Sequence, residues 1–457
     1  MTAQLPPGFL WGVASSAYQT EGATGAGGRG VSVWDTFCAT PGKVRAGASG
    51  DLACDFYHRY PEDIGLMRQL GIDAFRFSIA WPRVLPAGRG RVNQRGLDFY
   101  DRLVDALLAA GIRPFVNLFH WDTPQPLEDA GGWPRRETAE AFVELAAAVA
   151  DRLGDRVADW ITMNEPYCPA WLGYGLGIHA PGRAGAAEAL AAAHHLLLAH
   201  GWAVETLRTF SPRAEVGLVL DSWPVHPATD TEADVAAAWA ADGVANRWFF
   251  DAVLLGSYPE DVLERFDGSL PAIREGDLDT ISARLDFVGM NNYSRRRVRA
   301  GRGGAPVDVR SPTGDLTDTG WEVYPRALYE VLTRLRFEYG APSLYVTENG
   351  AAFADTRTHD GRVHDVERIA YLQGYLGAVS DAIAAGVPVR GYFVWSLLDN
   401  FEWALGYAKR FGLVYVDYPT QERVPKDSFR WYQGVIAAHR GSDALSGAHT
   451  PTSAGAP

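Results

Sequence analysis

Cysteine is scarce in this sequence, and long hydrophobic runs are missing. The 457 residues include three cysteines, Cys38, Cys54 and Cys168, whose spacing fits neither a metal site nor a redox pair. We therefore expect buried thiols and no disulfide scaffold. No run of about 18 apolar residues occurs, and the first residues lack a basic segment followed by an apolar one. The sequence thus favours a soluble, cytoplasmic protein without a membrane partner.

Basic residues are fewer than acidic ones. There are 42 Lys and Arg against 55 Asp and Glu, which gives a net charge of −13 with neutral histidine. Nucleic acids and anionic membranes repel a protein of this charge, so neither is expected as its main partner.

Several cofactor signatures are missing as well. The glycines between residues 22 and 30 do not open a helix after a strand, which disfavours a doubly wound sheet with a dinucleotide site. No H-E-x-x-H pattern occurs, and the spacing of five between His195 and His200 is poor for one helix face. We expect His194, His195 and His200 to pack within a helix, and we expect neither a cofactor nor a metal.

Hydrophobic residues, by contrast, are plentiful. They make up 47% of the chain against 21% charged residues, which is enough for a large core. Aromatic residues reach 12% and include 15 tryptophans, more than a core usually needs. An indole ring offers a flat apolar face and a polar edge, so this composition suits a site for sugar rings.

Eight short apolar runs alternate with segments of helical periodicity. The runs span residues 9–14, 72–79, 112–118, 160–163, 215–220, 285–290, 343–347 and 389–395. Apolar spacings of three and four indicate helices over residues 61–70, 96–110, 138–153, 184–208, 324–339 and 366–385, with Pro61 at a first helical position. Eight strands alternating with helices predict an α/β fold, a closed (β/α)8 TIM barrel of parallel strands.

The predicted barrel occupies nearly the whole chain. We expect one domain over residues 1–440, whose length is explained by long loops after the strands. Residues 441–457 are small, polar and proline-bearing, which predicts a disordered C-terminal tail. Residues 300–312 are rich in Gly and Arg and are expected to form a mobile inserted loop.

Two of the predicted strands end in a glutamate. Glu348 follows the apolar run 343–347 and precedes Asn349 and Gly350, and Glu165 stands between Asn164 and a proline that ends its run. Taken singly, each fits a surface glutamate after a strand. Together, on the fourth and seventh strands, they would face the C-terminal mouth of the barrel. A pair of carboxylates in one cleft is the arrangement that glycoside hydrolysis needs.

The sequence around these glutamates resembles a known family. Residues 162–166 (TMNEP) and 345–350 (YVTENG) look like the acid/base and nucleophile signatures of glycoside hydrolase family 1, the β-glucosidase family. Four more segments match in the order of the family: residues 9–22, 75–83, 118–122 and 395–403. The resemblance covers nearly the whole chain, and it implies that the domain at 1–440 is a glycoside hydrolase catalytic domain.

The resemblance implies hydrolysis of β-glycosides with retention of configuration. Glu348 would attack the anomeric carbon, and Glu165 would protonate the departing oxygen and later deprotonate water. Arg76 and Tyr293 match the residues that the family places beside the nucleophile, although each taken singly fits an ion pair or a core aromatic. Asn164 would contact the sugar 2-hydroxyl, a contact that strengthens in the transition state.

The resemblance also implies a binding pocket. The residues that would line the sugar subsite are Gln19, His120, Trp121, Asn164, Tyr293, Trp395, Glu402 and Trp403. Glu402 would accept bonds from two hydroxyls and repel a 6-phosphate, which implies a neutral sugar, although the cations Lys409 and Arg410 lie nearby in the sequence. The positions of possible aglycone contacts are Tyr167, His179 and Trp321. Asn292 departs from the family, many members of which carry an aromatic residue there.

The implied partner is a small-molecule β-glycoside. The expected activity is that of a β-glucosidase on terminal non-reducing β-D-glucosyl residues of small glucosides or cello-oligosaccharides, as in cellulose degradation, with galactosyl or fucosyl residues also compatible. Two rival functions remain open. A sugar-binding protein could keep the pocket without turnover, although both glutamates are present, and a transglycosidase would use the same residues. The sequence is also compatible with a homo-oligomer.

Overall fold

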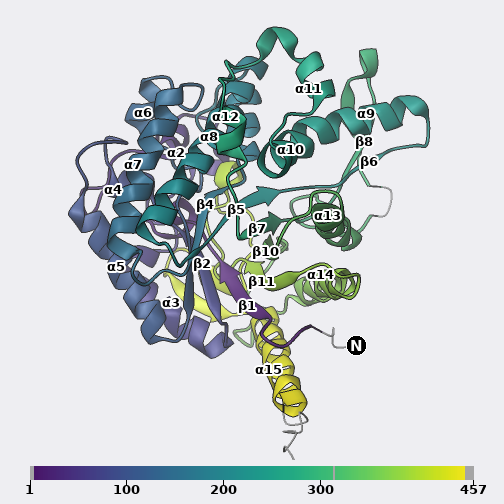
Figure 1. The fold of residues 1–457 in the computed structure, drawn as a ribbon. Helices are drawn as coiled ribbons and strands as arrows, with labels where there is room; N and C mark the ends of the chain where they lie inside the picture. The colour runs from purple at the N-terminus through teal and green to yellow at the C-terminus, as the bar shows by residue number, and fades with distance from the viewer. Residues whose placement is uncertain (1–4, 312–313, 448–457) are drawn as a thin grey trace, which may run out of the picture.

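Eight parallel strands form a closed barrel at the centre of the molecule (Figure 1). The structure, a computed structural model, describes residues 5–311 and 314–447. Around the barrel the strands follow the order β1-β11-β10-β7-β5-β4-β3-β2. Their bounds are β1 Leu10–Ala14, β2 Ala74–Ser78, β3 Arg113–Asn117, β4 Asp159–Asn164, β5 Glu215–Asp221, β7 Phe287–Asn291, β10 Leu344–Asn349 and β11 Val389–Trp395.

Every one of the eight apolar runs contributes one barrel strand, so the predicted (β/α)8 fold is confirmed. The last strand closes on the first, with Ala14 opposite Trp395 in the β1–β11 pair. Aromatic side chains fill the interior, where the Phe115 ring meets the Tyr345 ring at 5.4 Å and the Phe393 ring at 5.0 Å between centroids. The barrel is therefore a packed core, and the space for a ligand is left to the loops at the strand ends.

Helices surround the barrel (Figure 1). Their bounds are α1 Ala17–Thr20, α2 Val33–Ala39, α3 Phe56–Leu70, α4 Trp81–Val84, α5 Gln94–Ala109, α6 Gln125–Asp129, α7 Arg136–Leu153, α8 Ala186–Phe210, α9 Glu232–Asp242, α10 Trp248–Leu255, α11 Glu260–Arg265, α12 Asp277–Ile281, α13 Arg326–Phe337, α14 Val366–Ala384 and α15 Asp427–Gly447. The prediction for Pro61 was wrong, because α3 begins five residues earlier at Phe56. Phe56 is buried and its ring contacts the Tyr60 ring. This aromatic packing stabilises the helical turn before Pro61.

Two small sheets lie outside the barrel. Strands β6 (Val225–Pro227), β8 (Arg296–Ala300) and β9 (Pro306–Asp308) form one of them, beside α9 on one side of the barrel (Figure 1). Much of the segment expected to be a mobile loop, residues 300–312, thus belongs to a β-hairpin, because the β8 and β9 backbones pair in antiparallel register; residue 312 lies outside the described residues. Strands β12 (Val414–Asp417) and β13 (Glu422–Pro425) form the other sheet.

The last helix packs on the first strand of the barrel. Trp11 in β1 donates its indole N–H to His439 Nδ1 in α15 at 3.3 Å. The helix extends to Gly447, seven residues into the segment for which the sequence predicts a disordered tail, and residues 448–457 lie outside the described residues. The three cysteines are free and buried, as predicted. Within the described part of the chain, no helix combines the length and apolar character needed to span a membrane.

Candidate active site

Both strand-end glutamates lie at the C-terminal mouth of the barrel. Glu165 directly follows the last residue of β4, and Glu348 is the fifth of the six residues of β10. Their exposed fractions are 6% and 3%, so neither is a surface glutamate. The backbone of Glu165 has φ of 49°, a left-handed conformation that costs a non-glycine residue about 1–3 kcal/mol. Such strain is typical of residues held in place for function.

Glu348 is held by two donors. Arg76 Nη1 in β2 donates to one carboxylate oxygen, and the Tyr293 hydroxyl donates to the other at 2.5 Å. A guanidinium and a hydroxyl that both point at the carboxylate favour its negative charge. The structure thus places Arg76 and Tyr293 where the sequence predicts them.

Glu165 lies in a contrasting environment. Asn291 Nδ2 in β7 donates to its Oε1 at 2.6 Å, and the Cys168 thiol, in the π-helix η2 (Cys168–Gly175), lies 3.3 Å from its Oε2. No cation contacts it among the described residues. Burial raises the pKa of Glu165 well above its ordinary value, and the carboxylates of Asp221 and Glu348 raise it further. The surroundings of Glu165 therefore suit it to hold a proton, whereas Glu348 is paired with a guanidinium.

Two asparagines connect the glutamates. Asn164 Oδ1 accepts a bond from Arg76 Nη2 and one from Asn291 Nδ2, the latter at 3.0 Å. Thr347 in turn donates to Asn291 Oδ1 at 2.7 Å. The amide of Asn164 is thus oriented between the partner of Glu348 and the partner of Glu165.

Aromatic rings form one wall of a pocket beside these groups. The Trp121 and Trp403 rings lie 4.6 Å apart, and the His120 ring stacks at 5.9 Å on Trp395 and at 6.0 Å on Trp403. Trp121 donates its indole N–H to Asn164 O at 3.0 Å, which anchors the ring to the end of β4. Flat apolar faces with fixed polar edges suit a sugar ring.

The pocket also contains polar side chains, one of which has an oxygen without a hydrogen-bond partner. Burial and the charge of Glu348 raise the pKa of Glu402 to about 8, and its Oε2 is buried with no hydrogen-bond partner. Gln19 donates to Phe401 O at 2.9 Å, next to Glu402, and Asn164 Nδ2 lies 3.2 Å from His120 Nε2. Burial lowers the pKa of His120 well below its ordinary value, so this ring is neutral. A buried carboxylate oxygen that no protein group bonds is available as an acceptor for a hydroxyl of a ligand.

Comparison with known proteins agrees with this geometry. The model of the family described as Glycosyl hydrolase family 1 matches residues 1–441. The chain belongs to glycosyl hydrolase family 1. It is 48% identical over 436 residues to Beta-glucosidase A of Thermotoga maritima, which covers 95% of this chain and 98% of the relative. It is 46% identical to a Bifunctional beta-D-glucosidase/beta-D-fucosidase of Bifidobacterium breve. This match covers 96% of this chain and 99% of the relative. The structure of the Thermotoga maritima beta-glucosidase in complex with glucoimidazole superposes on this chain with a TM-score of 0.93 at 47% sequence identity. The superposition covers 95% of this chain and 99% of the other.

The three residues predicted on the aglycone side of this family 1 hydrolase lie in different surroundings. Trp321 packs 5.4 Å from the Tyr293 ring and 5.0 Å from the Trp223 ring, and both tryptophans line a cavity of about 620 Å³. Tyr167 is half-buried two residues after Glu165. His179 instead lies 5.8 Å from Trp121, within the aromatic wall. Burial lowers its pKa to about 4.

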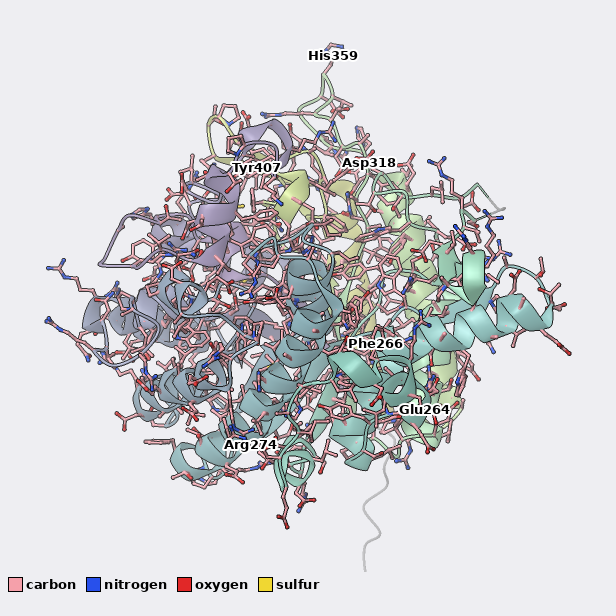
Figure 2. All side chains as sticks on the ribbon, turned by 90° about the horizontal axis from the view of Figure 1, so that it is seen from above. Glu264, Phe266, Arg274, Asp318, His359 and Tyr407 are labelled. Carbon is pink, nitrogen blue, oxygen red and sulfur yellow. The ribbon has the colours of Figure 1, made fainter. Side chains whose placement is uncertain are left out.

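Other charged and histidine residues of the hydrolase are engaged elsewhere. Lys409 lies 2.9 Å from an oxygen of Asp318, which is labelled in Figure 2, and Arg410 lies 2.7 Å from an oxygen of Asp399. The three histidines of α8 are buried and bonded to neighbouring residues, as predicted. Their partners are Tyr258 and Asp277 for His194, Trp133 O for His195, and Thr162 for His200.

Three residues around Glu165 were not predicted as parts of the site. Asn291 bonds it directly, Cys168 was predicted only as a buried thiol, and Asp221 lies nearby. One signal was present in the sequence: Asp221 follows an apolar run just as Glu348 does. The contact of Cys168 had no such signal, because it depends on the π-helical turn after β4.

Proposed function

We propose that this family 1 hydrolase is a retaining β-glucosidase. It removes terminal non-reducing β-D-glucosyl residues from small β-glucosides or cello-oligosaccharides, and galactosyl and fucosyl residues are secondary substrates. The names of the Thermotoga maritima and Bifidobacterium breve relatives support the glucosyl and fucosyl parts of this proposal. We assign the catalytic role to a single domain over residues 1–440, without a cofactor or metal.

The observation that carries the proposal is the contrast between the two buried glutamates. Glu348, charged beside Arg76, attacks the anomeric carbon, and the bond to the leaving oxygen breaks as Glu165 transfers its proton to that oxygen. Glu165, now a carboxylate, then takes a proton from water. The water oxygen bonds to the anomeric carbon and releases Glu348. Two displacements at one carbon retain its configuration.

Recognition of a neutral sugar follows from the charges in the pocket. The unpartnered oxygen of Glu402 is an acceptor for sugar hydroxyls, and Gln19, His120 and Asn164 supply further polar groups. Lys409 and Arg410 are paired with carboxylates, so neither is available to neutralise a 6-phosphate. The aromatic wall of Trp121, Trp395 and Trp403 supports the sugar ring. A plain glucoside therefore suits this pocket better than a phosphorylated one.

The leaving group belongs on the side of Tyr293 that faces Trp321. The cavity of about 620 Å³ lined by Trp223 and Trp321 offers space there. Tyr167 flanks the same side through its position after Glu165. We also propose His179, which lies 5.8 Å from Trp121 in the aromatic wall, as a contact of the leaving group. The three free thiols support a cytoplasmic location, where thiols remain reduced, and the final step of cellulose degradation is a fitting role.

The proposal is tested by a panel of chromogenic β-glucoside, β-galactoside, β-fucoside and 6-phospho-β-glucoside substrates. Wild type should prefer the glucoside, and Glu348→Gly should lose nearly all activity because the attacking group is gone. Azide or formate should restore part of the activity of Glu348→Gly by occupying the vacated space. Glu275→Gly, which removes an exposed glutamate from a turn, is the matched control and should match wild type. An unchanged rate in Glu348→Gly would refute the mechanism.

The same experiment addresses the two rival functions. A binding protein would retain glucose affinity and show no turnover in wild type. A transglycosidase would yield glycosylated product when an alcohol or a second sugar is added. Analysis of products with and without an acceptor separates transfer from hydrolysis.

A further inference from the structure

One carboxylate at the mouth of the barrel has no part in the mechanism described above. Asp221 is the last residue of β5, and it is half-buried. It stands opposite Asn291 in the β5–β7 pair, and Asn291 stands opposite Glu348 in the β7–β10 pair. Asp221, Asn291 and Glu348 thus form one row across three neighbouring strands, and the middle residue is the one that bonds Glu165.

Asp221 lies close to the proton donor. One carboxylate oxygen each of Glu165 and Asp221, together with the Cys168 sulfur, lie within 4.8 Å of one another. Among residues 5–311 and 314–447, no side-chain nitrogen of Lys, Arg or His lies within 4.0 Å of a carboxylate oxygen of Asp221. A carboxylate without a counter-ion, so near a second carboxylate, acts on it through an electrostatic field with little screening.

We propose that Asp221 is a positioning residue that keeps the transferable proton on Glu165; the inference rests on the proposed glycosidase function. Two negative charges this close oppose each other, so Glu165 gives up its proton less readily when Asp221 is ionised. Burial and the charge of Glu348 raise the pKa of Asp221 to about 7, so Asp221 becomes charged in the range where Glu165 must remain protonated.

The other groups that face Glu165 do not supply a neighbouring negative charge in both displacements of the reaction. The titratable groups around it are Glu348 from β10, Cys168 and Tyr167 from the segment after β4, and Tyr293 from the segment after β7, with Arg296 of β8 acting on Tyr167. Burial raises the pKa of Cys168 and of Tyr293 well above their ordinary values, so both stay neutral. Glu348 loses its charge when it becomes bonded to the sugar.

Asp221 therefore has its own role in the second step. In the glycosyl-enzyme, Glu348 is an ester without charge, and Glu165 is the carboxylate that must take a proton from water. A neighbouring negative charge strengthens that base. Asp221 thus remains as the carboxylate beside Glu165 throughout the cycle.

The test is the pH dependence of kcat/KM for Asp221→Asn on 4-nitrophenyl β-glucoside. The basic limb of the profile reports loss of the Glu165 proton in the free enzyme, and it should move to lower pH when the Asp221 charge is removed. The activity maximum should fall far less than the roughly 10²–10⁴-fold that loss of a general acid costs. Asp105→Asn, which removes a carboxylate that is 59% exposed on α5, is the matched control and should leave the profile unchanged.

A second measurement does not depend on activity. With ¹³C-labelled glutamate carboxyl groups, the Glu165 resonance is identified by its absence in Glu165→Gln, and its titration midpoint is compared between wild type and Asp221→Asn. The midpoint should be lower in the variant. If Asp221→Asn fails to fold, Asp221→Ser, which also removes the charge, takes its place.

The outcomes separate this inference from the proposed function. An unchanged basic limb together with an unchanged midpoint would overturn the role of Asp221, as would a change in KM alone, which indicates a contact to the leaving group. A wild type without turnover on any glycoside would instead overturn the proposed function. The midpoint would still report whether Asp221 acts on Glu165.

Discussion

At the scale of single residues, identical side chains acquire different chemistry from their neighbours. Glu348 receives hydrogen bonds from Arg76 and Tyr293, whereas Glu165 is surrounded by an amide, a thiol and other carboxylates. Glu402 is a third case, because burial and Glu348 raise its pKa and leave one oxygen without a partner. The side chain alone does not decide between the proposed roles of nucleophile, acid and sugar acceptor.

Replacement of Glu402 tests the sugar pocket at this scale. Glu402→Gln keeps the shape of the side chain but exchanges one acceptor oxygen for an NH2 group, so one bond to a sugar hydroxyl is lost. We expect kcat/KM for a β-glucoside to fall about 10- to 100-fold, since a buried sugar hydroxyl left without its acceptor costs about 1–3 kcal/mol. Glu422→Gln, at the exposed first position of β13, should leave kcat/KM unchanged. Equal kinetics for the two variants would exclude Glu402 from the pocket.

At the scale of elements, the site depends on how closely the ends of two neighbouring strands, β10 and β11, approach each other. A Cβ atom at Gly350, directly after β10, would lie 1.8 Å from the backbone oxygen of Trp395 at the end of β11. That oxygen cannot move without displacing the strand that carries Trp395. The glycine therefore brings the end of the strand of Glu348 against the strand of the sugar pocket.

A pair of glycine variants measures this contact. Gly350→Ala should destabilise the protein by about 1–3 kcal/mol, as overpacking does, and should also lower kcat/KM because Glu348 and Trp395 shift. Gly377→Ala, within α14, has open space for the added methyl group and should stabilise the protein by about 0.5–1 kcal/mol. Denaturant unfolding and steady-state kinetics of both variants give the comparison. A Gly350→Ala variant as stable and active as wild type would contradict the contact.

At the scale of the whole molecule, buried carboxyl groups make folding depend on pH. Asp122 is fully buried, and neither of its carboxylate oxygens has a hydrogen-bond partner. Burial raises its pKa to about 8, against about 3.9 in an unfolded chain. Between these values the folded state holds a proton that the unfolded state has released, so Asp122 lowers the free energy of unfolding as pH rises from about 4 to about 8.

Asp122→Asn should remove this dependence. The variant should gain stability relative to wild type as pH rises from 4.5 to 8, by an amount on the order of a few kcal/mol. Its difference from wild type should be smallest at pH 4.5, the value in this range nearest to the unfolded-state pKa of about 3.9, below which both states hold the proton. Denaturant unfolding at several pH values checks the trend, with Asp105→Asn as the exposed control. A difference that does not vary with pH would contradict a buried, neutral Asp122.

The barrel itself could be predicted because its pattern is local. Each apolar run is short, and turn residues and helical spacings separate the runs, so eight strands were identified with errors of a few residues at their ends. Pro61 and the hairpin of β8 and β9 were misjudged, because packing of Phe56 and pairing with residues 306–308 overrode the local signals. The two glutamates were found because a charge at the end of a buried strand is visible in sequence.

By itself, the sequence determined the order of strands and helices and the residue types placed at the strand ends. The tertiary structure alone decided which of those residues work together. Glu165 and Asp221 are 56 positions apart and Arg76 and Glu348 are 272 apart, yet desolvation and Coulomb interactions depend on distance in space. The proton on Glu165, the open oxygen of Glu402 and the ion pairs of Lys409 and Arg410 therefore exist only once the barrel has closed.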